Sequence, residues 1–437
     1  MYETTQEKDR NTRLIMSFFA VIFLADEALL PVFHFGGIPF KMSYLLAAAW
    51  IGCNLFHIRV FKNLSFNIEY KSDTAKILWG FWALIAISFL SELTMLVFSK
   101  QANTQPFFDG ILYYLYIIGA IGLGYSLWKM NPKIFVWVLY GYCLLNIAML
   151  MFYSSLPGFV RSLYGEYYAT GIRIRGTGGN ANTTLLVMNM IFMAVIMMVH
   201  KGLLKLKGIH LWLVMLLPLL TNFFVSSRGE FLQTLVLEVV LLYVIAKKDE
   251  NKMRVIGRLV VIAILVFLVY QLVFNYLYYI NDNIRYGIDR LQTLTNMSES
   301  DTEGVDVDGF SRPFLRADVF WARFKHSPIW GAGYSYGTAA DFVKSVNGYH
   351  NDWFRVLASV GVIGFGIWVI NMKKIVSTVG VYVLIPFFLA SLSNTFLQST
   401  HAINIYFFAI GIVLHWTQED HRKNQEQTNE EMRTYHE

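Results

Sequence analysis

Residues 181–200 read ANTTLLVMNMIFMAVIMMVH and contain no Asp, Glu, Lys or Arg. An α-helix needs about 20 consecutive apolar residues to cross the hydrocarbon core of a bilayer. This stretch is therefore typical of a membrane-spanning helix, and it sets the class of fold that the rest of the chain has to fit.

Runs of the same kind recur along the whole chain. Hydrophobic residues make up 55% of the 437 positions, charged residues 15%, and the mean hydropathy is +0.44. Apolar runs of about 17 to 25 residues lie at 13–33, 43–61, 76–98, 107–128, 132–154, 181–200, 209–225, 229–246, 256–280, 351–371, 376–392 and 398–416. We predict an all-α integral membrane protein, a single polytopic domain over 1–437 with about twelve spans. Because 209–246 could form one broken helix and the last two runs lie close together, about ten to thirteen spans stay open.

Lysine and arginine gather in every second loop, which predicts the orientation of the chain. The basic loops carry Lys8, Arg10 and Arg13; Arg59, Lys62, Lys71 and Lys76; Lys129 and Lys133; Lys201, Lys205 and Lys207; Lys247, Lys248, Lys252, Arg254 and Arg258; Lys373 and Lys374. The positive-inside rule then places both termini in the cytoplasm, with 417–437 as a solvated, frayed tail. The net charge of +6 is explained by this topogenic pattern, and we expect no nucleic-acid partner.

The first apolar run and the two cysteines bear on a signal peptide, a disulfide framework and a cysteine metal site. The first apolar run ends in Pro31 and His34 without a small-residue cleavage site, which favours a spanning helix over a signal peptide. Cys53 and Cys143 both fall inside predicted spans. Neither a disulfide framework nor a cysteine metal site is supported.

Several arginines oppose the orientation trend, because they fall in loops on the predicted outer side: Arg161, Arg173, Arg175 and Arg228. Arginine presents a planar fork of donors that suits phosphate. Contact with lipid head groups, with the aliphatic stem lying along the membrane, is the alternative for each of them.

Two of these sites have local sequence that suits an anion. Residues 173–182 read RIRGTGGNAN and lead into a span, with Asn180 or Asn182 as a candidate helix N-cap. Backbone amides and guanidinium groups could meet one phosphate there, although glycine-rich loops also occur without phosphates. In 226–230, SSRGE, the turn is so short that Arg228 must stay near the membrane surface, at the depth of a lipid diphosphate.

One long hydrophilic loop, 281–350, is predicted on the outer face. It is too long for a simple connector, and such loops are usually functional or disordered. Its second half mixes aromatic residues with Arg312 and Arg316 at spacings that suit a surface amphipathic helix. These two arginines could guide a saccharide or a second phosphate, and solvated surface charge is equally compatible.

The loop ends at His350 and Asn351, and nine residues later come Gly361-Val362-Ile363-Gly364. This places an imidazole where the polar loop meets a hydrophobic helix. A membrane enzyme needs a general base in such a position, and an ordinary interfacial histidine would also fit it.

These motifs together resemble the bacterial O-antigen polymerase and O-antigen ligase superfamily. The resemblance covers roughly 173–370 and rests on His350, Asn351, Gly361 and Gly364, on the turn Pro328–Gly333, on Ser227-Arg228-Gly229 and on 173–182. The segment Gly178–Ala181 departs from the family pattern, which often has an aromatic residue and a proline there. That departure leaves open which of Arg173 and Arg175 contacts diphosphate.

The resemblance implies a periplasmic-face glycosyltransferase of the bacterial inner membrane, with a fold similar to GT-C type membrane glycosyltransferases. Its donor would be an undecaprenyl diphosphate-linked oligosaccharide, with no metal or other cofactor. His350 would act as general base, and Arg228 with Arg173 or Arg175 would stabilise the leaving diphosphate. Asn351 would orient the imidazole or the acceptor, Gly361 and Gly364 would allow close helix packing, and a chain-length regulator is a candidate protein partner.

The resemblance does not separate a polymerase, which extends lipid-linked repeat units, from a ligase, which transfers the glycan to lipid A core. We favour the polymerase because such proteins are numerous and diverse. A flippase or other transporter of lipid-linked saccharide is the competing class. Its support is the acidic residues inside predicted spans, namely Asp26, Glu27, Glu92 and Glu238, because such acids often mark ion paths.

Overall fold

The computed structural model describes most of the helical part of the chain. The described residues are 5–30, 33–35, 38–56, 72–98, 109–152, 155–159, 161, 181–225, 227–248, 351–390 and 396–436, with short pieces at 257, 264, 267, 268, 271, 275, 276, 279, 320, 321, 324, 325 and 327–333. The elements are α1 (Thr5–Leu29), β1 (Phe33–Phe35), β2 (Ile38–Phe40), α2 (Met42–Leu55), α3 (Asp73–Phe98), α4 (Asp109–Ser126), α5 (Lys133–Met151), α7 (Ala181–His200), α8 (Ile209–Val225), α9 (Arg228–Lys248), α14 (Asp352–Val379), η7 (Val381–Leu384), α15 (Ile385–Leu389), η9 (Phe396–Gln398) and α16 (Thr400–His436).

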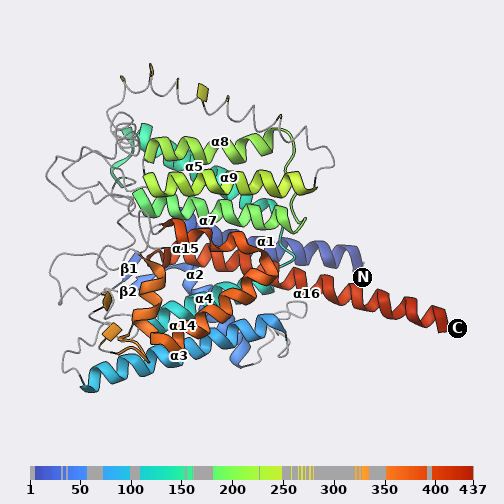
Figure 1. Cartoon of the computed structure of the whole chain (residues 1–437). Coiled ribbons are helices and arrows are strands. Elements are labelled where there is room, and N and C mark those ends of the chain that lie inside the picture. The colour runs from blue at the N-terminus through green and yellow to red at the C-terminus, as the bar shows by residue number, and fades with distance from the viewer. Residues whose placement is uncertain are drawn as a thin grey trace.

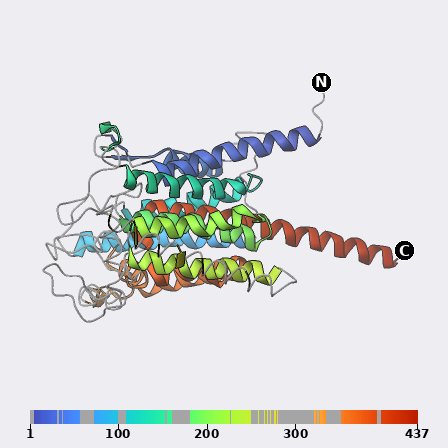
Figure 2. The ribbon, with the colours of Figure 1, turned by 90° about the horizontal axis from the view of Figure 1, so that it is seen from above.

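The helices lie side by side in one bundle, and both chain termini project from the same end of it (Figures 1 and 2). The opposite end, called the far end below, carries the β1–β2 hairpin and the first residues of α7, α9, α14 and α16 (Figure 1). The hairpin is antiparallel, with Phe33 opposite Phe40. The far end is therefore where the helices that follow the sequence motifs begin.

Four helical segments among the described residues are long and apolar enough to cross a membrane: Asp73–Thr94, Asn182–His200, Gly229–Lys248 and Asp352–Val379. Four shorter apolar helices accompany them. Large apolar side chains also face outward, among them Phe18, Trp79, Trp137, Val239 and Val362. Exposed apolar surface on this scale suits lipid as the surrounding solvent, and these helices suggest an integral membrane protein.

Several predicted spans agree with the helices in their bounds. The runs at 181–200 and 209–225 correspond to α7 and α8 residue for residue, and α9 is a separate helix, so 209–246 is not one broken helix. The predicted continuous helix over 376–392 is wrong. Gly380 breaks it with φ of 134°, so that α14 ends at Val379 and only the short elements η7 and α15 follow. The predicted span 256–280 lies almost entirely outside the described residues.

The C-terminal tail is helical where the sequence predicted a frayed end. Helix α16 continues to His436, and its side chains are exposed from Asp420 to Thr428. Arg422 pairs with Glu419 at 3.1 Å and with Glu426 at 3.7 Å. Ion pairs three and four residues apart stabilise a solvated helix modestly, and this accounts for its extension beyond the bundle.

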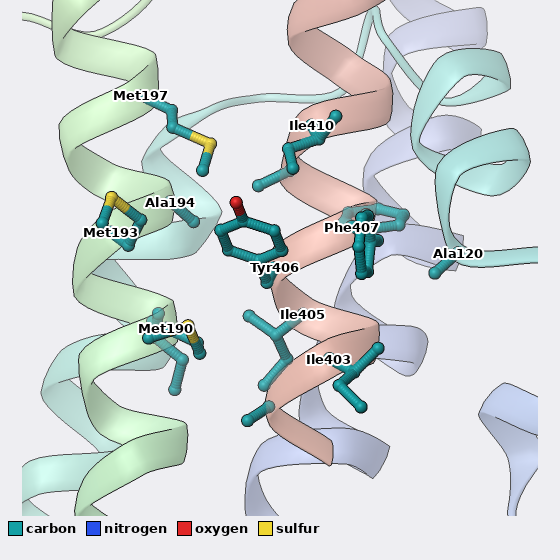
Figure 3. Packing of buried hydrophobic residues seen from close by; sticks show 14 of the residues in the cluster. Ala120, Met190, Met193, Ala194, Met197, Ile403, Ile405, Tyr406, Phe407 and Ile410 are labelled. Atoms are coloured by element: carbon teal, nitrogen blue, oxygen red, sulfur yellow. The ribbon is translucent and has the colours of Figure 1, made fainter. Parts of the chain in front are cut away.

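Helix α7 forms the centre of the core, and 94% of its apolar window is buried. A helix that is apolar on all sides has to be surrounded by other helices or by lipid, and α7 packs against α5, α8, α9 and α16. In Figure 3, Ala194 and Met197 of α7 face Tyr406 of α16. The Tyr406 hydroxyl donates to the carbonyl of Val383 at 2.7 Å, so this buried phenol is satisfied.

Glycines bring α4 and α16 into direct backbone contact. A Cβ on Gly124 would overlap the carbonyl of Phe408, and a Cβ on Gly411 would overlap the carbonyl of Ile121. Small residues at helix interfaces allow this close approach inside membranes. The α4–α16 pair consequently anchors the long C-terminal helix in the bundle.

Candidate functional site

The far end collects the N-termini of α7, α9, α14 and α16 (Figure 1). Each helix N-terminus carries a positive partial charge and unpaired amide groups. Two residues predicted from the sequence to act in the site occur at these starts. Arg228 is the first residue of α9, and Asn351 directly precedes α14. The far end therefore collects the partial positive charge of four helix starts.

Ser227 and Glu230 are bonded to each other at the start of α9. The Ser227 hydroxyl donates to the carboxylate of Glu230, and the amide of Phe231 donates to the Ser227 carbonyl at 2.9 Å. The two residues have the Ser-x-x-Glu spacing of a capping box, but the bond joins their side chains, and both side chains are buried. This bond restrains the first turn of the helix and therefore the backbone of Arg228. The description of Arg228 extends to its backbone only.

Buried polar side chains hold the first turns of α9 against α7 and α8. Asn189 of α7 donates to the Glu230 carbonyl at 3.0 Å and to the Gln233 side chain at 3.1 Å. The Thr234 hydroxyl donates to the side-chain oxygen of Asn189 at 2.7 Å, and it accepts from the side-chain amide of Asn222 of α8 at 2.8 Å. Such groups are costly inside a membrane unless they bond to one another. This network therefore keeps the helix that carries Arg228 in place.

Asn351 is the N-cap of α14. Its backbone is extended, and its side-chain oxygen accepts from the amides of Trp353 at 2.9 Å and Phe354 at 3.3 Å. Asparagine is among the preferred N-cap residues. The side-chain oxygen therefore has a structural partner, while a role of Asn351 toward a substrate remains a prediction. His350 is joined to it by a peptide bond and lies outside the described residues.

Gly361 and Gly364, the two motif glycines of α14, have different surroundings. Gly361 has φ of 63° and ψ of −171°, so α14 is kinked there. The turn 327–333 binds this kink through backbone hydrogen bonds, which run from the Ala332 amide to the Ala358 carbonyl (2.8 Å), from Gly333 to Ser359 (3.0 Å) and from Val362 to Pro328 (2.9 Å). The prediction that Gly361 serves helix packing is therefore wrong, because a turn and not a helix approaches it. At Gly364 a Cβ would lie 3.4 Å from the Ile87 side chain of α3.

A buried ionic cluster joins α1, α2 and α16 at the far end. The Lys41 amine lies 3.4 Å from Glu27 Oε2 and 2.8 Å from His401 Nδ1. His401 Nδ1 lies 3.0 Å from Glu27, and Asn404 donates to Glu27 at 2.5 Å. The neighbouring Asp26 carboxylate accepts from the Ser43 amide at 2.8 Å. The two acids of α1 thus have partners that offset the cost of burying their charge.

The structure does not describe the remaining predicted site residues. Arg173, Arg175, Arg312, Arg316 and His350 all lie outside the described residues. Their roles and their mutual distances remain predictions. What the structure brings together from the predicted set is the start of α9 at Arg228 and the start of α14 after Asn351, at one end of the bundle.

Some residues of the far end were missed by reasoning from sequence. Asp352 is completely buried and binds the backbone before α16, and Ser399 caps α16 by accepting from the Ala402 amide at 3.2 Å. The Ser-x-x-Glu spacing at the start of α9 can be recognised in a sequence. The partners of Asp352 and Lys41 lie at distant positions of the chain, so no local spacing reveals them.

A cavity lies at the end of the bundle from which the two chain termini project. Its volume is about 900 Å³, and its lining includes Lys76, Trp128, His415 and Arg422. This cavity is separated from the motif residues by the length of the bundle. Within the described part of the chain, His, Cys, Asp and Glu side chains form no group of three or more that could hold a metal ion.

Comparison with known proteins identifies the region that carries these motifs. No curated protein matches the chain. Residues 213–369 match a family model described as O-antigen ligase, and this interval contains Arg228, His350, Asn351, Gly361 and Gly364, while Arg173 and Arg175 precede it. The match over these residues supports the resemblance to the O-antigen polymerase and O-antigen ligase superfamily.

Proposed function

We propose that this protein is a glycosyltransferase of the bacterial inner membrane that polymerises undecaprenyl diphosphate-linked oligosaccharide repeat units on the periplasmic face. Both termini lie in the cytoplasm in this proposal, and the far end of the bundle faces the periplasm. The membrane supplies the lipid-linked donor, and a chain-length regulator is a candidate partner.

The observation that carries the proposal is the start of α9 at Arg228, at the same end of the bundle as the capped start of α14. Diphosphate gains negative charge as it leaves the sugar, so positive charge aimed at it stabilises the transition state more than the ground state. A helix N-terminus and a guanidinium group at one point supply such charge. Arg173 or Arg175 would contribute a second guanidinium group to the same diphosphate.

The acceptor hydroxyl has to lose its proton as its oxygen attacks the anomeric carbon. We assign this proton to His350, because a positioned general base accelerates such a step by about 10²- to 10⁴-fold. The new glycosidic bond forms as the bond to diphosphate breaks, and the electron pair leaves with the diphosphate. A single displacement of this kind inverts the anomeric configuration. Arg312 and Arg316 are proposed to guide the saccharide.

A ligase is the second candidate, because the matched family model is described as O-antigen ligase. Donor, base and arginines would be the same, and the acceptor would be lipid A core in place of another lipid-linked repeat. The lipopolysaccharide profile of a deletion strain separates the two. Single-repeat lipopolysaccharide indicates a lost polymerase, whereas polymer retained on the lipid carrier indicates a lost ligase.

Two of the four acidic residues that support the transporter alternative have hydrogen-bonding or ionic partners in the structure. Asp26 and Glu27 bond to Ser43, Lys41, His401 and Asn404, so their burial has a structural explanation. Intramembrane acids that carry ions must exchange partners, and a cluster satisfied from three elements is poorly suited to that.

Reconstitution of the purified protein with lipid-linked donor tests the proposal. Chain growth or transfer without an ion gradient supports the enzyme, whereas gradient-dependent movement of unreacted donor supports a transporter. His350→Ala and Arg228→Ala should each lower the rate of product formation by about 10²-fold or more while leaving the protein folded. Full activity in both variants would refute the assignment.

A further inference from the structure

Asp352 ties the start of α14 to the segment before α16. Its side chain is completely buried. One carboxylate oxygen accepts from the Phe396 amide at 2.9 Å and the other from the Leu397 amide at 3.0 Å. Both amides belong to η9, which ends two residues before α16 begins. The two oxygens therefore hold a segment that is distant in the sequence.

A buried carboxylate needs such compensation. Removing it from water is unfavourable unless donors replace the solvent, and hydrogen bonds from amides to a charged acceptor are among the stronger ones in proteins. Arg355, one turn further along α14 and also buried, attracts the same carboxylate. The two amides and Arg355 thus compensate the buried Asp352 side chain within the bundle, at a position where a neutral apolar residue would pack at lower cost.

The tether acts on the same turn that Asn351 caps. Asn351 holds the amides of Trp353 and Phe354 from within the helix, and Asp352 holds η9 from its side. The backbone at 351–352 is consequently fixed both to its own helix and to the start of α16. His350 is the next residue upstream, and a peptide bond keeps its Cα about 3.8 Å from that of Asn351.

We propose that Asp352 is a positioning residue for His350, and this inference rests on the proposed function in which His350 is the general base. Catalytic groups have to be held close to their productive geometry, since a misplacement of about 1 Å can cost about 10²-fold in rate. Asp352 restrains the backbone from which the imidazole projects. It touches neither substrate nor reacting atoms in this role.

A double-mutant cycle tests the inference with the full-length protein in liposomes and purified lipid-linked donor. Asp352→Asn keeps the size of the side chain but replaces one acceptor oxygen by an amide group that faces a backbone donor. In the wild-type background we expect kcat to fall about 10- to 100-fold with KM nearly unchanged. In a His350→Ala background the same substitution should lower the residual rate by less than about twofold.

Asp26→Asn is the matched control. Asp26 is also buried at the far end, and its carboxylate also accepts a backbone amide, that of Ser43, at 2.8 Å. It tethers α1 to α2 and has no connection to α14. We expect Asp26→Asn to lower the melting temperature as much as Asp352→Asn does, while kcat stays within about twofold of wild type.

The outcomes are distinguishable. Unchanged kcat in Asp352→Asn, or losses that multiply fully with His350→Ala, would overturn the inference and leave the proposed function standing. Full activity of His350→Ala would overturn the proposed function and the inference with it. Asp352→Glu is the second variant if Asp352→Asn does not fold. A folded, slow Asp352→Glu protein supports positioning, whereas loss of folding in both variants assigns Asp352 a purely structural role.

Discussion

Gly331 and Gly361 lie so close that a Cβ on either residue would be 2.5 Å from the backbone nitrogen of the other. Both have positive φ, 83° and 63°, which other L-residues rarely adopt. The turn that follows Pro328 therefore fits into the kink of α14 only because both positions lack a side chain. This contact joins the turn 327–333 to the helix that follows Asn351.

Replacing Gly361 should uncouple the turn from the helix. In Gly361→Ala the new methyl group would overlap the Ile329 carbonyl, and the strained φ alone costs about 1–3 kcal/mol. We expect a lower melting temperature in detergent and loss of polymer or ligation product. Gly366→Ala is the control, because it lies in the same helix and a Cβ there meets nothing within 4 Å. Equal behaviour of the two variants would contradict the proposed contact.

The α4–α16 contact should be equally intolerant of a side chain. Gly124→Ala would press a methyl group into the Phe408 carbonyl, and overpacking of this kind costs about 1–3 kcal/mol. Thermal unfolding in micelles should show the loss. Gly141→Ala, in α5, adds a Cβ that has nothing within 4 Å and should leave stability unchanged or slightly raised. A stable Gly124→Ala protein would mean that the two helices can separate at little cost.

The spans could be predicted from the sequence because their length and apolar character are local properties. The bounds of α7 and α8 follow directly from the runs at 181–200 and 209–225. The apolar run at 376–392 predicted one continuous helix. This prediction was wrong because Gly380, with φ of 134°, ends α14 within the run. Apolar composition indicates that a segment favours an apolar environment, but it does not indicate where a single glycine will end a helix.

The candidate site could be predicted only as a set of motifs on one side. Arg228 begins α9 and Asn351 directly precedes α14, and these two helix starts lie at one end of the bundle. The tether from Asp352 to Phe396 and the pairing of Glu27 with His401 could not be predicted, since each joins residues far apart in the chain. Acids inside spans therefore suggested an ion path from sequence, whereas two of them, Asp26 and Glu27, have fixed partners in the fold.

Removing the Ser227–Glu230 bond at the start of α9 should affect activity more than stability. Ser227→Ala deletes this bond, and loss of one side-chain hydrogen bond typically costs about 1 kcal/mol. Because the backbone of Arg228 follows directly, we also expect a fall in the transfer rate. Ser72→Ala is the control, since Ser72 caps α3 by accepting from the Ala75 amide at 3.1 Å. It should cost similar stability and leave the rate unchanged, and a rate loss in both variants would argue against a special role for the α9 start.

The buried ionic cluster should behave unlike a surface ion pair. Lys41→Met leaves Glu27 without its cation in a site where both side chains are fully buried, and breaking such a pair costs about 3–5 kcal/mol. Lys76→Met removes an exposed pair with Asp73 and should cost less than about 1 kcal/mol. Chemical unfolding in mixed micelles measures both. Adding Glu27→Gln to Lys41→Met should recover much of the loss, because the cost arises from the uncompensated carboxylate. No recovery would mean instead that Lys41 acts through its bond to the Asp26 carbonyl at 2.6 Å, which Glu27→Gln leaves broken.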